Sequence, residues 1–255
     1  MSRIFLVVIT RIVPSQPVLI LEGQKRHLIA TDLHIGFESN LASKQIFVGK
    51  NTSIVESIEQ LSSVIDSENP DDLILLGDIK SSIKTISRNE WDEVPLFLKK
   101  LQEKTSIILI PGNHDSNIQK LVPDGITMIS LFGLVIENTL LTHGRTMPTE
   151  NFSHVNKIIM GHVHPVFFEE DSVLNGQRVW VSLKVEKEKL FPSSSGEIEI
   201  TIVPSFNRYF YATKKKTYKK SISPILERIK DFSSAKIATL DGTIIGDESL
   251  LSQVI

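Results

Sequence analysis

Short apolar segments alternate with amphipathic segments through the first 160 residues of the chain. The apolar segments are rich in Ile, Leu and Val, a composition typical of strands buried on both faces; they span residues 4–9, 18–21, 28–30, 73–76, 107–110, 140–141 and 158–160. Between them, apolar side chains recur at helical spacing from Ile54 to Ile65, and a second apolar stripe runs from Trp91 to Leu101. This alternation predicts an α/β fold.

The pattern changes after residue 165. Residues 165–170 and 178–185 flank the turn signal Asn175-Gly176 and predict a hairpin. Strands at 197–203 and 236–240 and an amphipathic helix at 223–232 complete the expected elements. We therefore expect a main domain over residues 1–205 and a C-terminal extension over residues 206–255, in which a basic segment, a helix and a strand pack on that domain.

The composition narrows the class of protein. Of 255 residues, 41% are hydrophobic and 23% charged, which excludes a disordered, collagen-like or coiled-coil chain. A formal net charge of -2 gives no overall field that attracts polyanions or membranes. Cysteine is absent, so disulfides, thiol catalysis and cysteine-based metal sites are excluded, and any metal ligands are His, Asp, Glu or Asn.

The apolar start of the chain does not predict a secretory signal or a membrane span. Residues 4–9 are too few for a signal sequence, and Arg11 follows them in place of a small-residue cleavage site. No apolar run approaches the roughly 20 residues that cross a bilayer. We expect a cytoplasmic protein with no membrane partner.

Polar side chains follow five of the predicted strands. In an open α/β sheet, ligands bind beyond the carboxyl ends of the strands, where side chains from different strands converge. The five polar clusters are Asp32-Leu33-His34, Gly77-Asp78, Gly112-Asn113-His114-Asp115, His143-Gly144-Arg145 and Gly161-His162-Val163-His164. We expect them to meet at one place in the fold.

The residue types in these clusters suit divalent cations. Asp32 and His34 are two residues apart, so both can point to the same side of the chain, and an Asp with a neutral imidazole suits a borderline divalent ion. Asp78 follows a central strand and is the natural carboxylate to bridge two cations, while Asn113 would add a neutral ligand. One such motif alone is commonly a loop carboxylate or a core histidine, which is our interpretation of His27 and His154 outside the clusters. All five clusters in order favour a two-metal centre.

These five clusters resemble the signature blocks of the calcineurin-like metallophosphoesterases, and the resemblance covers residues 32–164. It implies a four-layer αββα sandwich of two mixed β-sheets flanked by helices. It also implies two ligand sets that share Asp78. Metal one would be held by Asp32, His34, Asp78 and His164, and metal two by Asp78, Asn113, His143 and His162.

Within that superfamily the chain is similar to the archaeal and bacterial branch related to the DNA-ligase-associated phosphoesterases. The residues that carry this similarity are Gly36, Trp91 to Pro95, His164-Pro165 and Pro204-Ser205-Phe206-Asn207. The sequence departs from the branch at Ser81, where a His is common. Ser81 is not among the implied metal ligands, so this departure bears on the substrate rather than on metal binding.

The resemblance implies a hydrolase in which a metal-bridging hydroxide attacks the phosphorus atom in line. The cofactors would be two divalent metal ions, manganese first, with iron, zinc or cobalt as alternatives. His114, beside Asp115, would stabilise developing charge or protonate the leaving oxygen, so we assign both residues to catalysis. Arg145 either binds a phosphate oxygen or is an ordinary exposed arginine.

The substrate is a phosphate ester, and we favour a phosphodiester of DNA or RNA, hence a nuclease or phosphodiesterase. Residues 208–220 interleave Arg and Lys with aromatic side chains and contain no acid, as single-stranded nucleic acid binding requires. The alternative interpretation of that segment is a solvated basic loop. A small-molecule nucleotide or phosphomonoester phosphatase remains the alternative function. A non-catalytic scaffold of the same fold is disfavoured, because such scaffolds lose catalytic groups that are present here.

Overall fold

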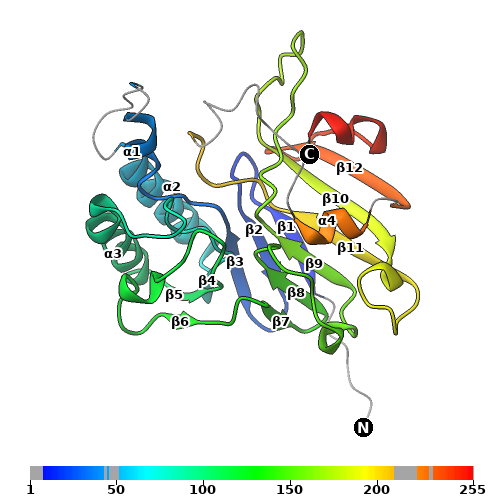
Figure 1. Ribbon diagram of the computed structural model, residues 1–255, viewed down its shortest axis with the longest axis horizontal. Coiled ribbons are helices and arrows are strands. Elements are labelled where there is room, and N and C mark those ends of the chain that lie inside the picture. The colour runs from blue at the N-terminus through cyan, green and yellow to red at the C-terminus, as the bar shows by residue number, and fades with distance from the viewer. Residues whose placement is uncertain (1–7, 43–44, 46–51, 210–222, 230–231, 255) are drawn as a thin grey trace.

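Two mixed β-sheets form the centre of the protein in the computed structural model, which describes residues 8–42, 45, 52–209, 223–229 and 232–254 (Figure 1). The first sheet has the order β1-β2-β3-β4-β5-β6, with bounds Ile9–Ile12, Leu19–Glu22, Arg26–Ala30, Asp72–Leu75, Ser106–Leu109 and Thr127–Met128. Strands β3 to β6 run parallel, whereas β1 and β2 are antiparallel additions at one edge.

The second sheet has the order β13-β12-β10-β11-β9-β8-β7, with bounds Ile244–Gly246, Ser234–Thr239, Val179–Glu186, Glu197–Ile202, Lys157–Met160, Thr139–Thr142 and Leu134–Ile136. Its parallel part is β8-β9-β11, and the remaining neighbours pair antiparallel. In both sheets, the predicted metal ligands come after strands that run parallel.

An apolar layer lies between the two sheets. Its buried members come from both sheets and include Leu19, Ile29, Ile74, Leu141, Ile159 and Trp180. Strands that contribute to this layer and to an outer core have no solvated face, which explains why the sequence shows them as continuous apolar runs.

Two helices cover the outer face of the first sheet, on the left of Figure 1: α2 (Thr52–Glu68) and α3 (Arg88–Gln102). The short α1 (Phe37–Ala42) packs in a separate apolar cluster with Val166. A capping box between Ser87 and Glu90 begins α3. The outer face of the second sheet is covered by the short α4 (Pro224–Arg228) and a 3₁₀ helix at Glu248–Gln253. The predicted α/β sandwich of two mixed sheets flanked by helices is confirmed, with a thin fourth layer.

The predicted hairpin around Asn175-Gly176 is the main difference from the expected elements. Residues 165–170 form a single bridge, Val166 with Arg178, and no strand. The reason is that β12 pairs with β10 from Val179 and β11 occupies its other edge from Val181 onward. Only the first residues of β10 and those before it remain open on that edge, where the N–H of Val179 donates to the carbonyl oxygen of Pro165 at 3.1 Å.

The C-terminal part of the chain enters the second sheet. Strand β12 pairs with β10 over six positions, and Ile225 and Ile237 are buried in the outer core of that sheet. The domain division at residue 205 stays a prediction. Most of the basic segment 208–220 lies outside the described residues, as does most of the predicted strand 4–9. Within the described ranges, no helix is both long and apolar enough to cross a bilayer.

Candidate metal centre

The predicted ligands follow the carboxyl ends of parallel strands in both sheets. Asp32 and His34 follow β3, Asp78 follows β4, and Asn113 follows β5. The second sheet contributes three histidines, His143 after β8 and His162 and His164 after β9. The structure brings them into two groups that share Asp78.

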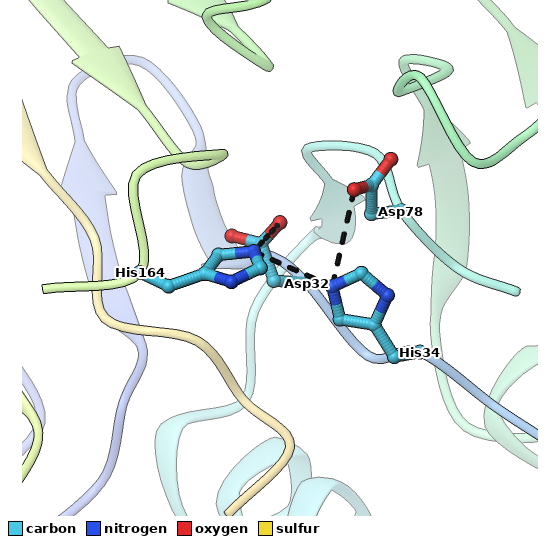
Figure 2. Close-up of side chains that lie close together, drawn as sticks. All are labelled: Asp32, His34, Asp78 and His164. Carbon is cyan, nitrogen blue, oxygen red and sulfur yellow. Dashed lines mark hydrogen bonds and ion pairs between the residues drawn. The ribbon is translucent and has the colours of Figure 1, made fainter. Parts of the chain in front are cut away.

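The first group consists of Asp32, His34, Asp78 and His164, all buried (Figure 2). His164 Nε2 lies 2.8 Å from Asp32 Oδ1 and 3.3 Å from His34 Nε2. His34 Nε2 lies 3.9 Å from Asp78 Oδ2. Donor atoms from two sheets therefore face one another across a few ångströms, as Figure 2 shows.

One oxygen of the first group has the environment expected of a metal ligand. Asp32 Oδ1 is buried and accepts no well-formed hydrogen bond from any described residue, even though His164 Nε2 is only 2.8 Å away. A buried carboxylate oxygen left this way is costly, and a cation facing both atoms would compensate it.

The second group consists of Asp78, His143 and His162, with Asn113 beside them. His143 Nε2 lies 3.4 Å from Asp78 Oδ1 and 3.0 Å from Asn113 Oδ1. Its other ring nitrogen, Nδ1, lies 2.7 Å from the carbonyl oxygen of Leu76, which can only accept, so Nδ1 carries a proton. Burial alone would lower the pKa of His143, but the facing Asp78 carboxylate outweighs it and raises that pKa to about 9, so without an ion Nε2 also carries a proton, which a cation bound there would replace.

Burial and charge set the protonation of these groups. Burial lowers the pKa of His34 well below its usual value and that of His162 to about 4, so both rings are neutral, as metal ligation requires. Burial alone would raise the pKa of Asp78, but the facing His143 ring outweighs it and keeps that pKa well below its usual range. Asp78 is therefore an anion at neutral pH.

The backbone at this centre is strained in a way that the sequence does not reveal. Five predicted ligands have positive φ, at 56° for Asp32, 45° for His34, 53° for Asp78, 70° for His162 and 54° for His164. Each non-glycine residue in this region costs on the order of 1–3 kcal/mol. Such strain accumulates at functional sites, where it directs side chains that a regular strand would separate.

Neighbouring groups hold Asp32 in place. Its Oδ2 accepts hydrogen bonds from Thr31 Oγ1 and the backbone N–H of His162, each at 3.0 Å, and so connects the two sheets. Its carbonyl oxygen accepts from Ser205 Oγ at 2.9 Å and from the backbone N–H of Asn207 at 3.2 Å. Residues 204–207 carry the family resemblance, but nothing in their sequence indicates this positioning role.

His114 lies at the edge of the first group. Its Nδ1 is hydrogen-bonded to the carbonyl oxygen of Ser81, and its Nε2 lies 3.8 Å from Asp78 Oδ2. Its ring meets His34 edge to face at 4.8 Å, and 16% of its side chain is exposed. His114 can therefore face both a substrate and the buried ligands.

Asp115 and Arg145 have different surroundings. Asp115 is buried, and its carboxylate accepts backbone N–H groups of Ile79 at 2.9 Å, Lys80 at 3.3 Å and Gly112 at 2.8 Å. These bonds join the loops after β4 and β5, which carry Asp78 and Asn113. Arg145 is exposed, and its Nη1 donates to the carbonyl oxygen of Gly112 at 3.3 Å. The catalytic assignments of these residues stay predictions.

His27 and His154, which the sequence does not predict as ligands, lie outside both groups. His27 is buried and pairs with Asp72 at 2.7 Å between Nδ1 and Oδ1, whereas His154 is exposed. Their separation from the centre agrees with the interpretation of both as ordinary polar or core histidines.

Comparison with known proteins places the chain in a family. No match was found among the curated protein sequences. The structure is similar to a crystal structure of the nuclease MPE from Pseudomonas putida, with a TM-score of 0.54, 16% sequence identity, and coverage of 93% of this chain and 100% of that chain. It is also similar to Yfce, a phosphoesterase from E. coli, with a TM-score of 0.41, 15% identity, and coverage of 88% and 98%.

A family model provides the sequence-level assignment. The model described as calcineurin-like phosphoesterase matches residues 25–189, which include every residue of both ligand groups and the strands that carry them. The match spans well over half of the chain, and its members hydrolyse phosphoric esters with divalent metals. The chain therefore belongs to the calcineurin-like phosphoesterase family.

Proposed function

We propose that the chain is a two-metal phosphodiesterase that acts on nucleic acid. Metal one would be held by Asp32, His34, Asp78 and His164, and metal two by Asp78, Asn113, His143 and His162. The observation that carries this proposal is the pair of buried ligand groups that share one carboxylate. The set of oxygen and imidazole donors accepts manganese, iron, zinc or cobalt, and we favour manganese.

Asp78 is suited to bridge the two groups. Its Oδ1 lies 3.4 Å from His143 Nε2 in the second group, and its Oδ2 lies 3.9 Å from His34 Nε2 in the first. Its two oxygens therefore face different groups. Two bound cations would supply an activated water and neutralise charge on the phosphoryl oxygens.

His114 would act on the leaving group. The bond from Nδ1–H to the carbonyl oxygen of Ser81 fixes the ring, and Nε2 then faces the ligand groups. A proton held on Nε2 can pass to the departing oxygen or stabilise its charge. Asp115 supports this geometry by joining the two loops, and Arg145 offers its remaining guanidinium donors to a phosphate oxygen.

Two observations support nucleic acid as the substrate class. The fold neighbour from Pseudomonas putida is a nuclease. Residues 208–220 carry Arg208 and five lysines among aromatic residues, without an acid. Lysine contacts to phosphate and stacking on aromatic rings are the two interactions that bind single strands.

A substrate panel tests this proposal. We expect the purified chain with Mn²⁺ to hydrolyse bis(p-nitrophenyl) phosphate and single-stranded DNA faster than p-nitrophenyl phosphate. Chelation should remove these activities and added Mn²⁺ should restore them, because attack needs the ions that the two groups bind. An Asp78→Asn variant, prepared in parallel, controls for contaminating nucleases and should be inactive.

The contrary results are distinct. Full activity after metal removal, verified by elemental analysis, contradicts the two-metal proposal. Faster hydrolysis of the monoester, with no cleavage of DNA, leaves the family assignment in place but assigns the chain to small phosphomonoesters.

A further inference from the structure

A surface pocket of about 380 Å³ lies outside both ligand groups and contains two arginines, Arg178 and Arg208, with Ser15, Thr239 and Asp241 also lining it. We call it the arginine pocket. It forms where the turn before β2 meets the end of β12, and the backbone N–H of Ser15 donates to the carbonyl oxygen of Leu240 at 2.9 Å there. Its volume is within the range of small-ligand sites.

Among the residues that the structure describes, neither arginine has a carboxylate partner. No described acidic residue forms an ion pair with Arg178 or Arg208 within 4.0 Å. Asp241 lines the pocket, but its carboxylate is held by Thr239 Oγ1 and the backbone N–H of Thr243 in its own turn. Burial and the charge of Arg208 lower the pKa of Arg178 to about 10, so Arg178 remains a cation at neutral pH.

The donor geometry leaves most of both guanidinium groups available. Arg178 uses Nη1 to donate to the carbonyl oxygens of Ser205 and Phe206, both at 2.7 Å. These bonds orient the side chain, while its Nε and Nη2 have no hydrogen bond to a described residue, and neither has the Arg208 side chain. Two neighbouring cations with free planar donors form a site for an anion with several oxygens, and phosphate suits this geometry best.

The arginine pocket is connected to the candidate metal centre through one short segment. Ser205 accepts a hydrogen bond from Arg178 through its carbonyl oxygen and donates through Oγ to the carbonyl oxygen of Asp32 at 2.9 Å. Asn207, directly before Arg208, donates its backbone N–H to the same oxygen of Asp32 at 3.2 Å. Arg178 therefore donates to the segment 205–207, and Arg208 directly follows it. The same segment contacts Asp32, a predicted metal ligand.

We propose that the arginine pocket binds a second phosphate of the substrate, in addition to the phosphate that is hydrolysed. This inference rests on the proposed function and narrows it, because it requires a substrate that carries more than one phosphate. A nucleic-acid strand is such a substrate, and a nucleoside bisphosphate is another. The Asp241 carboxylate also lines the pocket and repels anions, so a bound phosphate must turn its oxygens toward the two arginines.

The experiment compares substrates with one and with several phosphates. Arg208→Ala is the main variant, because the Arg208 side chain makes no described hydrogen bond whose loss would disturb the fold. Arg228→Ala is the matched control, since Arg228 is an exposed arginine on α4 that donates to the carbonyl oxygen of Lys189. The substrates are a single-stranded oligodeoxynucleotide, a nucleoside 3′,5′-bisphosphate and bis(p-nitrophenyl) phosphate.

We expect Arg208→Ala to lower kcat/KM on the oligonucleotide by about 10- to 100-fold, the range of one lost charged hydrogen-bonding partner. The slope of log affinity against log salt should flatten by about one phosphate contact. On bis(p-nitrophenyl) phosphate, which has a single phosphate, the loss should stay below about threefold. Arg178→Lys, which keeps the charge but not the planar donor pair, should give the same selectivity with a smaller loss.

Equal losses on all three substrates, or no loss on either of the two substrates that carry more than one phosphate, overturn the proposal. A loss confined to the bisphosphate assigns the second phosphate to a small molecule and overturns the strand as its source. Binding of a fluorescent oligonucleotide to the intact chain, with chelator present, separates this inference from the proposed function. If the oligonucleotide binds in a way that depends on Arg208 but is not hydrolysed, the proposed function is wrong and the arginine pocket still binds phosphate. If the oligonucleotide is hydrolysed and Arg208→Ala leaves its binding unchanged, the proposed function holds and the arginine pocket does not bind the substrate.

Discussion

His114 differs from His34, His143 and His164 because 16% of its side chain is exposed, whereas those three residues are buried. His114 is also absent from both ligand groups. Its exposure and its absence from both groups favour a residue that acts on the substrate over one that holds an ion.

We expect His114→Ala to retain metal while its turnover falls by roughly 10²- to 10⁴-fold, the range for a lost general acid or charge stabiliser. Metal content by elemental analysis and kcat on a phosphodiester are the two measurements. His154→Ala is the control, because His154 is exposed and lies outside both groups. Loss of metal from His114→Ala would show that His114 is a ligand. A smaller deficit on a substrate whose leaving group needs no proton would identify acid catalysis.

At the scale of single residues, the sequence predicted which side chains come together but not the backbone conformation that brings them there. Residue type and order predicted only that the five polar clusters meet. The family resemblance implied Asp32, His34, Asp78 and His164 as one ligand set, and these four residues lie together. Their positive φ angles were not predictable, because glycine is the only residue whose presence in a sequence commonly indicates that conformation. Ser205 and Asn207 were not assigned a positioning role either, since their contacts to Asp32 join residues that are distant along the chain.

At the scale of elements, the loops after the parallel strands matter more than the strands themselves. The loop after β4 and the loop after β5 pass each other closely, because Gly77 leaves no side chain between them. A Cβ added at Gly77 would lie 2.6 Å from the backbone nitrogen of Gly112. The close approach sets the separation of Asp78 from Asn113.

Two glycines with the same backbone conformation separate the effect of this close loop contact from that of the conformation itself. Gly77 and Gly176 have nearly the same φ, +81° and +80°, but a Cβ added at Gly176 meets nothing within 4 Å. We expect Gly176→Ala to lower the free energy of unfolding by about 1–2 kcal/mol, the cost of a left-handed alanine. Gly77→Ala should lower it further and also reduce metal content, because the two loops must separate. Urea denaturation and elemental analysis measure both effects, and equal losses would contradict the role of Gly77.

Elements with a clear apolar pattern were predicted well, and those defined by tertiary pairing were not. The predicted segments 28–30, 73–76, 107–110 and 158–160 correspond to β3, β4, β5 and β9. The missed strands β6, β7 and β13 are two or three residues long and lie at sheet edges, where a short exposed stretch shows no periodicity. The strand expected at 165–170 forms only a bridge, because β11 occupies that edge of β10 from Val181 onward.

At the scale of the whole molecule, the candidate metal centre connects the two sheets. The first sheet contributes Asp32, His34, Asp78 and Asn113, and the second contributes His143, His162 and His164. Away from this centre the sheets are joined by the apolar layer around Leu141, Ile159 and Trp180. Ions bound by ligands from both sheets would hold the native arrangement and have no equivalent in the unfolded chain.

This connection predicts that metal stabilises the whole fold. Mn²⁺ at about 100 times its dissociation constant should raise the free energy of unfolding by about 2.7 kcal/mol. For a chain of this size, that corresponds to a rise in Tm of roughly 5–10 °C. Differential scanning calorimetry with chelator and with Mn²⁺ measures the rise. Asp78→Asn should abolish it and lower metal content, because both ligand groups lose their shared carboxylate.

The control for this measurement is His27→Asn, which breaks a buried pair with Asp72 that lies outside the centre. That variant should melt at a lower temperature both with chelator and with Mn²⁺, because an unpaired buried carboxylate costs stability in either condition. The rise on adding Mn²⁺ should nevertheless remain at its parental size. If Asp78→Asn keeps the full rise, the stabilising ion binds elsewhere, and the two sheets are then joined by their apolar layer without help from metal.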